Sequence, residues 1–129
     1  MPARAIFEYA TIRVVPRVER GEFINVGVIL FSKSMDYLDL RYQVEEERLN
    51  ALFPGIDIPD ICRHLDAFHK ICRGDKDAGP IAQLDKPSRF RWLTAKRSTI
   101  IQCSDVHPGL CTEPVSLLDR LFNEQVGSP

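Results

Sequence analysis

The sequence is poor in three features: net charge, long apolar runs and paired cysteines. Seventeen lysines and arginines are balanced by 18 aspartates and glutamates, so no overall field attracts nucleic acid or an anionic membrane. No stretch approaches the ~20 apolar residues of a membrane span, and the polar, strand-like start lacks the continuous apolar region of a signal peptide. These absences predict a cytoplasmic protein without membrane contact.

The cysteines and histidines do not form a metal or redox motif. No C-x-x-C pair is present, so we expect free thiols in a reducing compartment. His64 and His69 stand five residues apart on an expected helix, about 140° apart around its axis, and so cannot share a ligand. We therefore expect no metal and no cofactor. The cysteines are Cys62, Cys72, Cys103 and Cys111.

The sequence does contain enough apolar material for one folded domain. Of its 129 residues, 44% are hydrophobic and 27% are charged, which is ordinary for a globular chain long enough to bury a core. No internal repeat or low-complexity tract divides it. We expect a single domain over residues 1–129.

Alternating patterns in the first third predict three strands. Residues 7–16, FEYATIRVVP, and residues 37–44, YLDLRYQV, alternate between their two sides. Residues 22–32, EFINVGVILFS, are largely apolar on both sides, which is typical of a central strand. The short connections predict a three-stranded antiparallel meander. A strict alternation puts four side chains on one face of the central strand: Ile24, Val26, Val28 and Leu30.

The pattern then changes to a helical period. Residues 45–55 begin with acids and end at a Pro-Gly pair, which indicates a short helix. Asp57 can cap a longer helix that carries an apolar stripe and ends at Gly74. Turn-forming and charged residues at 74–88 predict a mobile loop.

The last third is expected to return to the sheet and to end in a helix. Residues 98–103 are strand-like, and residues 105–111, DVHPGLC, are expected to form a turn. Thr112 can cap a final amphipathic helix whose apolar face begins at Val115. The fold class is therefore α+β: an antiparallel sheet, made of the N-terminal three-stranded meander plus a later strand, with helices packed on it.

A polar interruption of the central strand is the first candidate site. Asn25 stands near Gly27; its amide both donates and accepts, and glycine lets a ligand or another backbone come close. Arg13 lies on the expected neighbouring strand, and arginine is the usual fork for carboxylate or phosphate. Arg20 and Glu22 belong to the hinge between the strands. The same pattern also fits a hairpin in which Asn25 bonds to a neighbouring strand and the charges are merely solvated.

Two later segments also carry polar groups. Ser104, Asp105 and His107 suggest a catalytic triad, but no G-x-S-x-G elbow is present and a strand-end serine commonly makes turn bonds, so a hydrolase is disfavoured.

Residues 88–97, SRFRWLTAKR, interleave cations with aromatic rings, as proteins that bind single-stranded nucleic acid do. They fit an edge strand with a buried face equally well, and the charge balance argues against nucleic acid.

Two tracts resemble the bacterial family known as domain of unknown function 3037. They are YATIRVVPRVERGEFINVGVILF near the start and FRWLTAKRSTIIQCSDVHPGLCTEPVSLLDRLF near the end. Their most specific parts are Arg20-Gly21-Glu22 with Asn25-Val26-Gly27-Val28, and Ser104 with His107, Gly109 and Leu110. The resemblance spans nearly the whole chain, although residues 45–88 match only in being helical.

The resemblance implies an accessory protein, because family members tend to be encoded beside a HipA-type kinase. One hypothesis is a non-catalytic binding module for a protein partner, such as that kinase. The alternative is a small enzyme or anionic-ligand-binding domain that uses Glu22 or His107 as acid or base and Arg13 to hold an anion. Convergence in one pocket favours the alternative, and dispersal favours the module. The candidate residues are Arg13, Arg20, Glu22, Asn25, Ser104 and His107.

Overall fold

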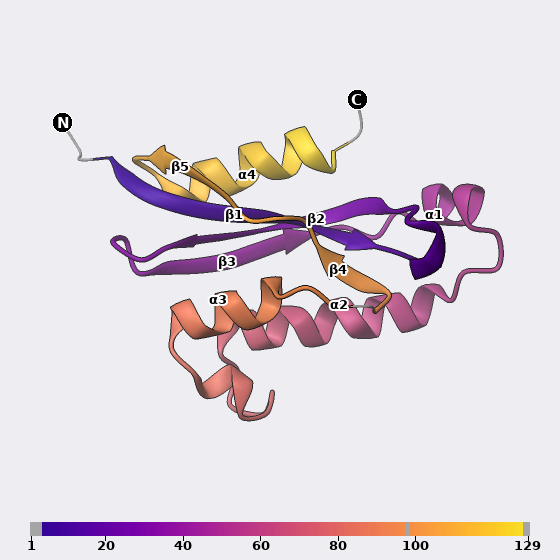
Figure 1. Ribbon diagram of the computed structural model, residues 1–129, viewed down its shortest axis with the longest axis horizontal. Helices are drawn as coiled ribbons and strands as arrows, with labels where there is room; N and C mark the ends of the chain where they lie inside the picture. The colour runs from indigo at the N-terminus through magenta and orange to yellow at the C-terminus, as the bar shows by residue number, and fades with distance from the viewer. Residues whose placement is uncertain (1–3, 98, 128–129) are drawn as a thin grey trace.

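The computed structural model describes residues 4–97 and 99–127, which form a five-stranded antiparallel sheet with helices on both faces (Figure 1). The order is β3-β2-β1-β4, and β5 also pairs with β1. The first three strands make the expected meander, so the α+β fold class is confirmed. The strands are β1 (Ala5–Val14), β2 (Ile24–Ser32), β3 (Tyr37–Tyr42), β4 (Ile101–Cys103) and β5 (His107–Cys111).

The helices divide between the two faces of the sheet. α2 and α3 pack on one face and α4 on the other, each over its own apolar cluster (Figure 1). In the described part of the chain, no helix is both long enough and apolar enough to cross a membrane. The helices are α1 (Glu46–Leu52), α2 (Ile58–Arg73), α3 (Lys86–Thr94) and α4 (Pro114–Gln125), with short 3₁₀ turns η1 (Val18–Arg20) and η2 (Ile81–Gln83).

A β-bulge in β2 changes which side chains face which layer. The register of β1 with β2 shifts between Ile12 and Arg13, which leaves Val26 as an extra residue on β2. The strict alternation predicted for this strand is therefore wrong, and Asn25 lies on the α4 face. In the observed arrangement Ile24, Val26, Ile29 and Phe31 belong to the α2 cluster, and Val28 and Leu30 belong to the α4 cluster.

Gly27 follows the bulge because the neighbouring strand leaves no room for a side chain. A Cβ atom at this position would lie 2.7 Å from the Arg41 carbonyl oxygen and 2.9 Å from Tyr42 Cβ. The space that the sequence offered to a ligand or another backbone is therefore taken by β3.

Residues 86–94 form α3, whereas one interpretation of this segment was an edge strand. That interpretation is wrong because helix signals coincide here. The Asp85 carboxylate accepts a hydrogen bond from the Ser88 amide at 2.9 Å, and Pro87 fits the first turn. Phe90 and Leu93 lie three residues apart and are both buried, as neighbours on one helix face should be.

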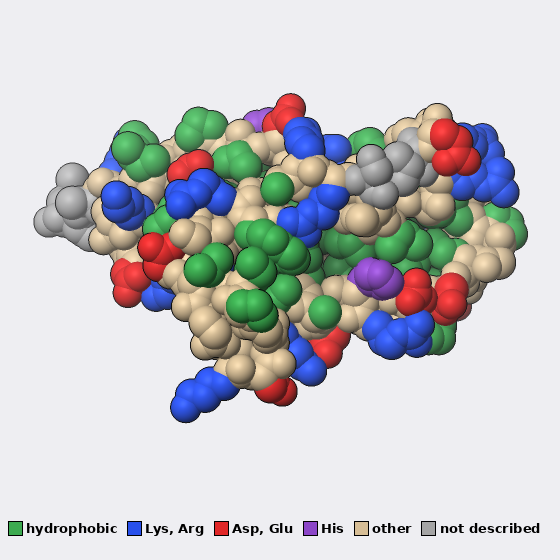
Figure 2. All heavy atoms as spheres, turned by 60° about the horizontal axis from the view of Figure 1, so that its bottom comes forward, with side chains coloured by type: hydrophobic (Ala, Val, Ile, Leu, Met, Phe, Trp, Pro, Cys, Tyr) green, Lys and Arg blue, Asp and Glu red, His purple; other side chains and the backbone are tan. Residues whose placement is uncertain are grey.

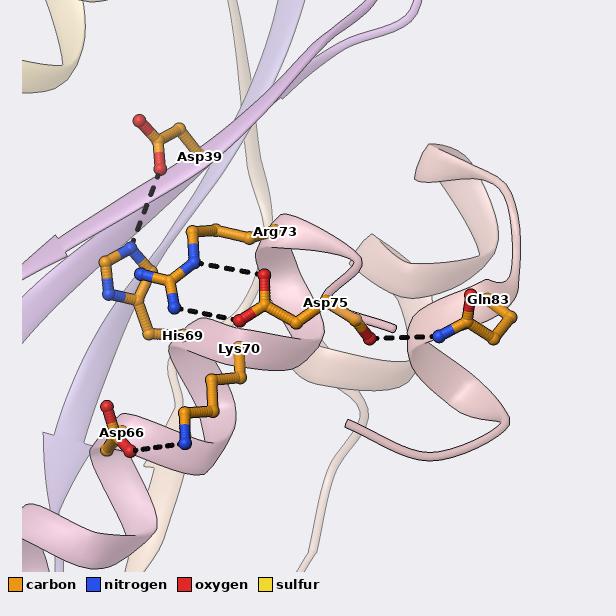
Figure 3. Close-up of polar contacts among 7 residues, drawn as sticks. All are labelled: Asp39, Asp66, His69, Lys70, Arg73, Asp75 and Gln83. Carbon is orange, nitrogen blue, oxygen red and sulfur yellow. Dashed lines mark hydrogen bonds and ion pairs between the residues drawn. The ribbon is translucent and has the colours of Figure 1, made fainter. Parts of the chain in front are cut away.

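The loop predicted at residues 74–88 is wrong in its second half, which contains η2 and the first turn of α3. The first half is attached to the end of α2. Arg73 Nη2 donates to Asp75 Oδ2 at 2.9 Å, and Gln83 Nε2 donates to the Asp75 carbonyl oxygen at 2.9 Å (Figure 3). The predicted end of α2 at Gly74 is confirmed, with the glycine in the left-handed conformation at φ 74°.

The turn predicted at residues 105–111 is wrong, because residues 107–111 form β5 along the edge of the sheet. The Pro108-Gly109 pair resembles a turn locally, but an edge strand tolerates a residue without an N–H group. The strand predicted at residues 98–103 is confirmed as β4, starting at Ile101, while Ser98 lies outside the described residues.

The final helix is confirmed, but its beginning differs from the expectation. Glu113, not Thr112, caps α4: its carboxylate accepts a hydrogen bond from the Val115 amide at 3.1 Å. Val115 is 57% exposed, so it does not begin the apolar face. Leu118 and Leu121 are buried against the sheet as expected.

Candidate functional site

Three of the six polar candidates lie on one strip of the sheet, on its α4 face: Arg13, Asn25 and His107. α4 packs mainly against β2 and β3. Strand pairing places Arg13 of β1 between Asn25 of β2 and Gln102 of β4, and it places Tyr9 beside His107 of β5. We call this surface the β1 strip. It comprises Tyr9, Arg13, Phe23, Asn25, Gln102 and His107.

Arg13 is the cation of the β1 strip. Its guanidinium carbon lies 4.0 Å from the centre of the Phe23 ring, at cation–π distance. In the part of the chain that the structure describes, its buried Nε has no hydrogen-bond partner, and no ion pair includes Arg13. Because a guanidinium carries five N–H donors, Arg13 offers a positioned fork to a carboxylate or phosphate.

The two polar atoms of the Asn25 side-chain amide have different surroundings. Its Nδ2 donates to the Gln125 carbonyl oxygen at 3.1 Å and so satisfies an acceptor at the end of α4. Its Oδ1 is buried and has no partner among the residues described. The nitrogen is therefore structural, and the oxygen is an unused acceptor across the strand pair from Arg13.

Ser104 has a structural role between β4 and β5. It is 5% exposed, and its backbone amide donates to the Thr11 carbonyl oxygen at 2.8 Å. Its Oγ accepts from the Thr11 amide at 2.9 Å and donates to the Asp105 carbonyl oxygen at 2.9 Å. These bonds continue the pairing with β1 between β4 and β5, so the hydroxyl proton is not directed at an imidazole base.

His107 stands at the other end of the β1 strip from Asn25. Its exposed ring packs against Tyr9, with 5.4 Å between ring centres. Tyr9 and Arg13 are four residues apart, or roughly 13 Å along a strand. His107 and Asn25 therefore lie on the same sheet face but do not converge on one point.

Arg20 and Glu22 form a separate group at the hinge between β1 and β2. Arg20 Nη2 and Glu22 Oε1 form an ion pair at 2.5 Å, and both side chains are largely exposed. With Arg17 they line a cleft of about 460 Å³ whose opposite wall is the segment between α1 and α2. The six predicted residues thus divide into the strip, the hinge and the structural Ser104.

Several basic and aromatic residues of the tract 88–97 contact one another or the rest of the molecule. Lys96 forms an ion pair with Asp105, and this hydrogen bond holds the pKa of the Asp105 carboxyl below its usual range. The Arg97 guanidinium carbon lies 4.1 Å from the centre of the Trp92 ring. Figure 2 shows hydrophobic side chains gathered near the middle of this face, with separate basic side chains around them, which does not favour nucleic acid.

A dense charged cluster that the sequence did not single out lies where α2 meets β3. His69 Nε2 is 3.9 Å from Asp39 Oδ1, while Arg73 pairs with Asp75 (Figure 3). Arg73 and Asp75 neutralise each other, and the His69 ring lies beside the Asp39 carboxylate. Within residues 4–97 and 99–127, no three histidine, cysteine, aspartate or glutamate side chains are arranged to hold a metal ion, and all four cysteines are free.

Three residues of the β1 strip were not among the candidates predicted from the sequence: Tyr9, Phe23 and Gln102. Phe23 shares the alternation of Asn25, which was a usable signal for a neighbour of Arg13. Gln102 joins the strip because β4 pairs with β1 and sets it opposite Arg13, and no local pattern specifies that pairing.

Comparison with known proteins gives one relationship. Neither the curated proteins nor the solved structures include a match to this sequence. The family model described as "Protein of unknown function (DUF3037)" matches residues 9–126, a range that includes both the β1 strip and the hinge. The chain therefore belongs to the DUF3037 family.

Proposed function

We propose that this chain is a small, non-catalytic binding module of the cytoplasm that docks a protein partner on the β1 strip. The observation that carries the proposal is the pair of unused groups at its centre. Arg13 Nε and Asn25 Oδ1 are both buried and lack partners among the described residues, and their two residues stand opposite each other on paired strands. Such groups are costly to leave unpaired unless something else satisfies them.

The shape of the strip favours a protein surface over a small substrate. Its polar groups are spread over roughly 13 Å of strand instead of surrounding a cavity. Phe23 is 46% exposed beside Arg13, and an aromatic ring next to an arginine is typical of interface anchors. The alternative is a small enzyme or anionic-ligand-binding domain that uses Glu22 or His107 as acid or base with Arg13. It is less favoured, because His107 stands at the other end of the strip and Glu22 is paired with Arg20.

The chemistry of the strip specifies what the partner presents. Arg13 would take a carboxylate in a forked pair through its two terminal nitrogens, because its Nε is buried. An aspartate or glutamate of the partner supplies that carboxylate. The HipA-type kinase encoded beside family members is the candidate partner that the family resemblance implies.

The test is a binding titration of the purified chain against the co-encoded HipA-type kinase. We expect Arg13→Ala to weaken binding at least about tenfold, because charge-assisted hydrogen bonds are lost, while the melting temperature changes little. Arg41→Ala is the matched control. Arg41 also lies over an aromatic ring, Phe122, at 4.5 Å, but its charge is already paired with Asp119.

Three results would contradict the proposal. The first is full binding by Arg13→Ala, the second is equal weakening by Arg41→Ala, and the third is no binding of the kinase by the wild-type chain. A large drop in the melting temperature of Arg13→Ala with binding intact would make the arginine structural instead.

A further inference from the structure

The hinge cleft combines an apolar floor with charged side chains at its rim. It holds about 460 Å³, a volume within the range of small-molecule sites. Phe53, Ile56 and Ile100 are partly buried and pack on the main apolar cluster. The lining residues that carry the argument are Arg17, Arg20, Glu22, Phe53, Ile56 and Ile100.

Both carboxylates that line the cleft are already engaged. Glu22 pairs with Arg20 at 2.5 Å, and the Asp57 carboxylate accepts a hydrogen bond from the Asp60 amide at 3.0 Å as the cap of α2. Arg17 is exposed, and none of the ion pairs among the described residues includes it. The cleft therefore has one available cation and a second one held by a side chain that can move away.

We propose that the hinge cleft is a binding site for a small organic carboxylate with an aromatic or aliphatic body. The body covers the apolar floor, and the carboxylate binds Arg17. Glu22 is paired with Arg20, and the ligand's carboxylate must compete with Glu22 for this arginine. Glu22 therefore lowers the affinity of the site for the ligand. This site is independent of the β1 strip, because the cleft is lined by the hinge and the α1–α2 segment, whereas Arg13 lies on the α4 face of the sheet.

The test uses 2-naphthoate as the probe and its uncharged analogue, 2-naphthylmethanol, as the comparison. Amide chemical shifts of the ¹⁵N-labelled full chain are followed during each titration. We expect saturable shifts for naphthoate within residues 16–22 and 52–57 and at Ile100, with the alcohol binding at least about tenfold more weakly. Equal affinity of the two probes would show an apolar cleft without anion recognition.

Variants at the rim separate the roles of Arg17 and Glu22. Arg17→Ala is expected to weaken naphthoate binding at least about fivefold, and Glu22→Gln to strengthen it about two- to fivefold, as expected for release of an exposed ion pair. Lys33→Ala, in the turn between β2 and β3, and Arg13→Ala should leave the affinity unchanged. The amide spectrum of each variant also reports whether it is folded.

Besides equal affinity of the two probes, four outcomes overturn the proposal. They are the absence of saturable binding up to the solubility of the probe, shifts centred away from the cleft, no loss of affinity in Arg17→Ala, and weaker binding by Glu22→Gln. Because Arg13→Ala should not alter this binding, failure here and failure of partner docking can be told apart.

Discussion

Asn25 joins two layers of the molecule with one side chain. Its position on β2, just before the bulge, brings its nitrogen to the last turn of α4, where backbone carbonyls lack helical partners. The pattern of the sequence identified the residue as unusual but left its role open. In the structure the side-chain nitrogen bonds to α4, and the side-chain oxygen has no partner among the described residues.

We predict that Asn25→Ala lowers the free energy of unfolding by about 1 kcal/mol, because the Gln125 carbonyl oxygen loses its donor. Asn25→Asp should be more destabilising, since it removes the same donor and puts a negative charge at the negative end of a helix. Urea denaturation of the two variants beside the wild type measures both effects. An aspartate variant as stable as the wild type would show that this bond contributes nothing.

At the scale of the element, α2 is fixed to β3 through His69. Its ring packs edge-on to Tyr42, with 5.8 Å between ring centres. Burial, assisted by the nearby Arg73, lowers the pKa of His69, while Asp39, Asp66 and Asp75 oppose the shift. Lys70 of α2 pairs with Asp66 beside this ring (Figure 3). The neutral imidazole is therefore the form that this junction prefers.

Because the pKa of His69 is lowered, its contribution to the free energy of unfolding depends on pH. The unfolded chain binds the proton first, so the His69 contribution is complete above the ordinary histidine pKa of about 6.5 and is lost as the pH falls toward the lower folded pKa. We predict that His69→Gln loses less stability than the wild type between about pH 7 and about pH 5. Urea midpoints at the two pH values give the comparison, and identical losses would exclude His69 as the cause.

The elements that could be predicted from the sequence are those specified by local signals. α2 has its Asp57 cap, its Gly74 end and a continuous apolar stripe, and all three are present in the structure. The edge strand was not predictable in the same way. Its Pro-Gly pair favours a turn, and only the pairing of residues 107–111 with β1, far away in sequence, makes it a strand.

The sequence predicted several residues of the candidate site but not how they are arranged in space. Strand alternation and neighbouring strands were enough to place Arg13 beside Asn25, as observed. The separation of the hinge from the strip depends on the bulge and on the α1–α2 segment that closes the cleft. These are tertiary features, and the hydrophobic periodicity of a single segment does not predict them.

At the scale of the whole molecule, β2 links the two apolar clusters. It gives Ile29 to the α2 cluster and Val28 to the α4 cluster, and both residues are fully buried. Removing either helical layer would expose one face of this strand. We therefore expect the two clusters to unfold as one cooperative unit.

The cysteines provide a test, because they sample both clusters. Cys72 and Cys103 belong to the α2 cluster, where burial raises the pKa of each thiol to about 12, and Cys111 belongs to the α4 cluster. We predict that these three thiols become reactive toward iodoacetamide at the same urea concentration, as read by mass spectrometry. Exposed Cys62 should react in the native state and serves as the internal control. Separate midpoints for Cys72 and Cys111 would show two independent units.

The two outer strands also limit how copies of this protein can meet. On β5, Pro108 has no N–H to give, and on β3 the outward amide of Leu40 is occupied by the Asp39 carboxylate at 2.8 Å. A sheet edge grows into fibres or shared sheets only when it presents an uninterrupted row of donors and acceptors. β3 and β5 are both interrupted in this way, which disfavours edge-to-edge aggregation through these two strands and directs association to side chains on the sheet faces.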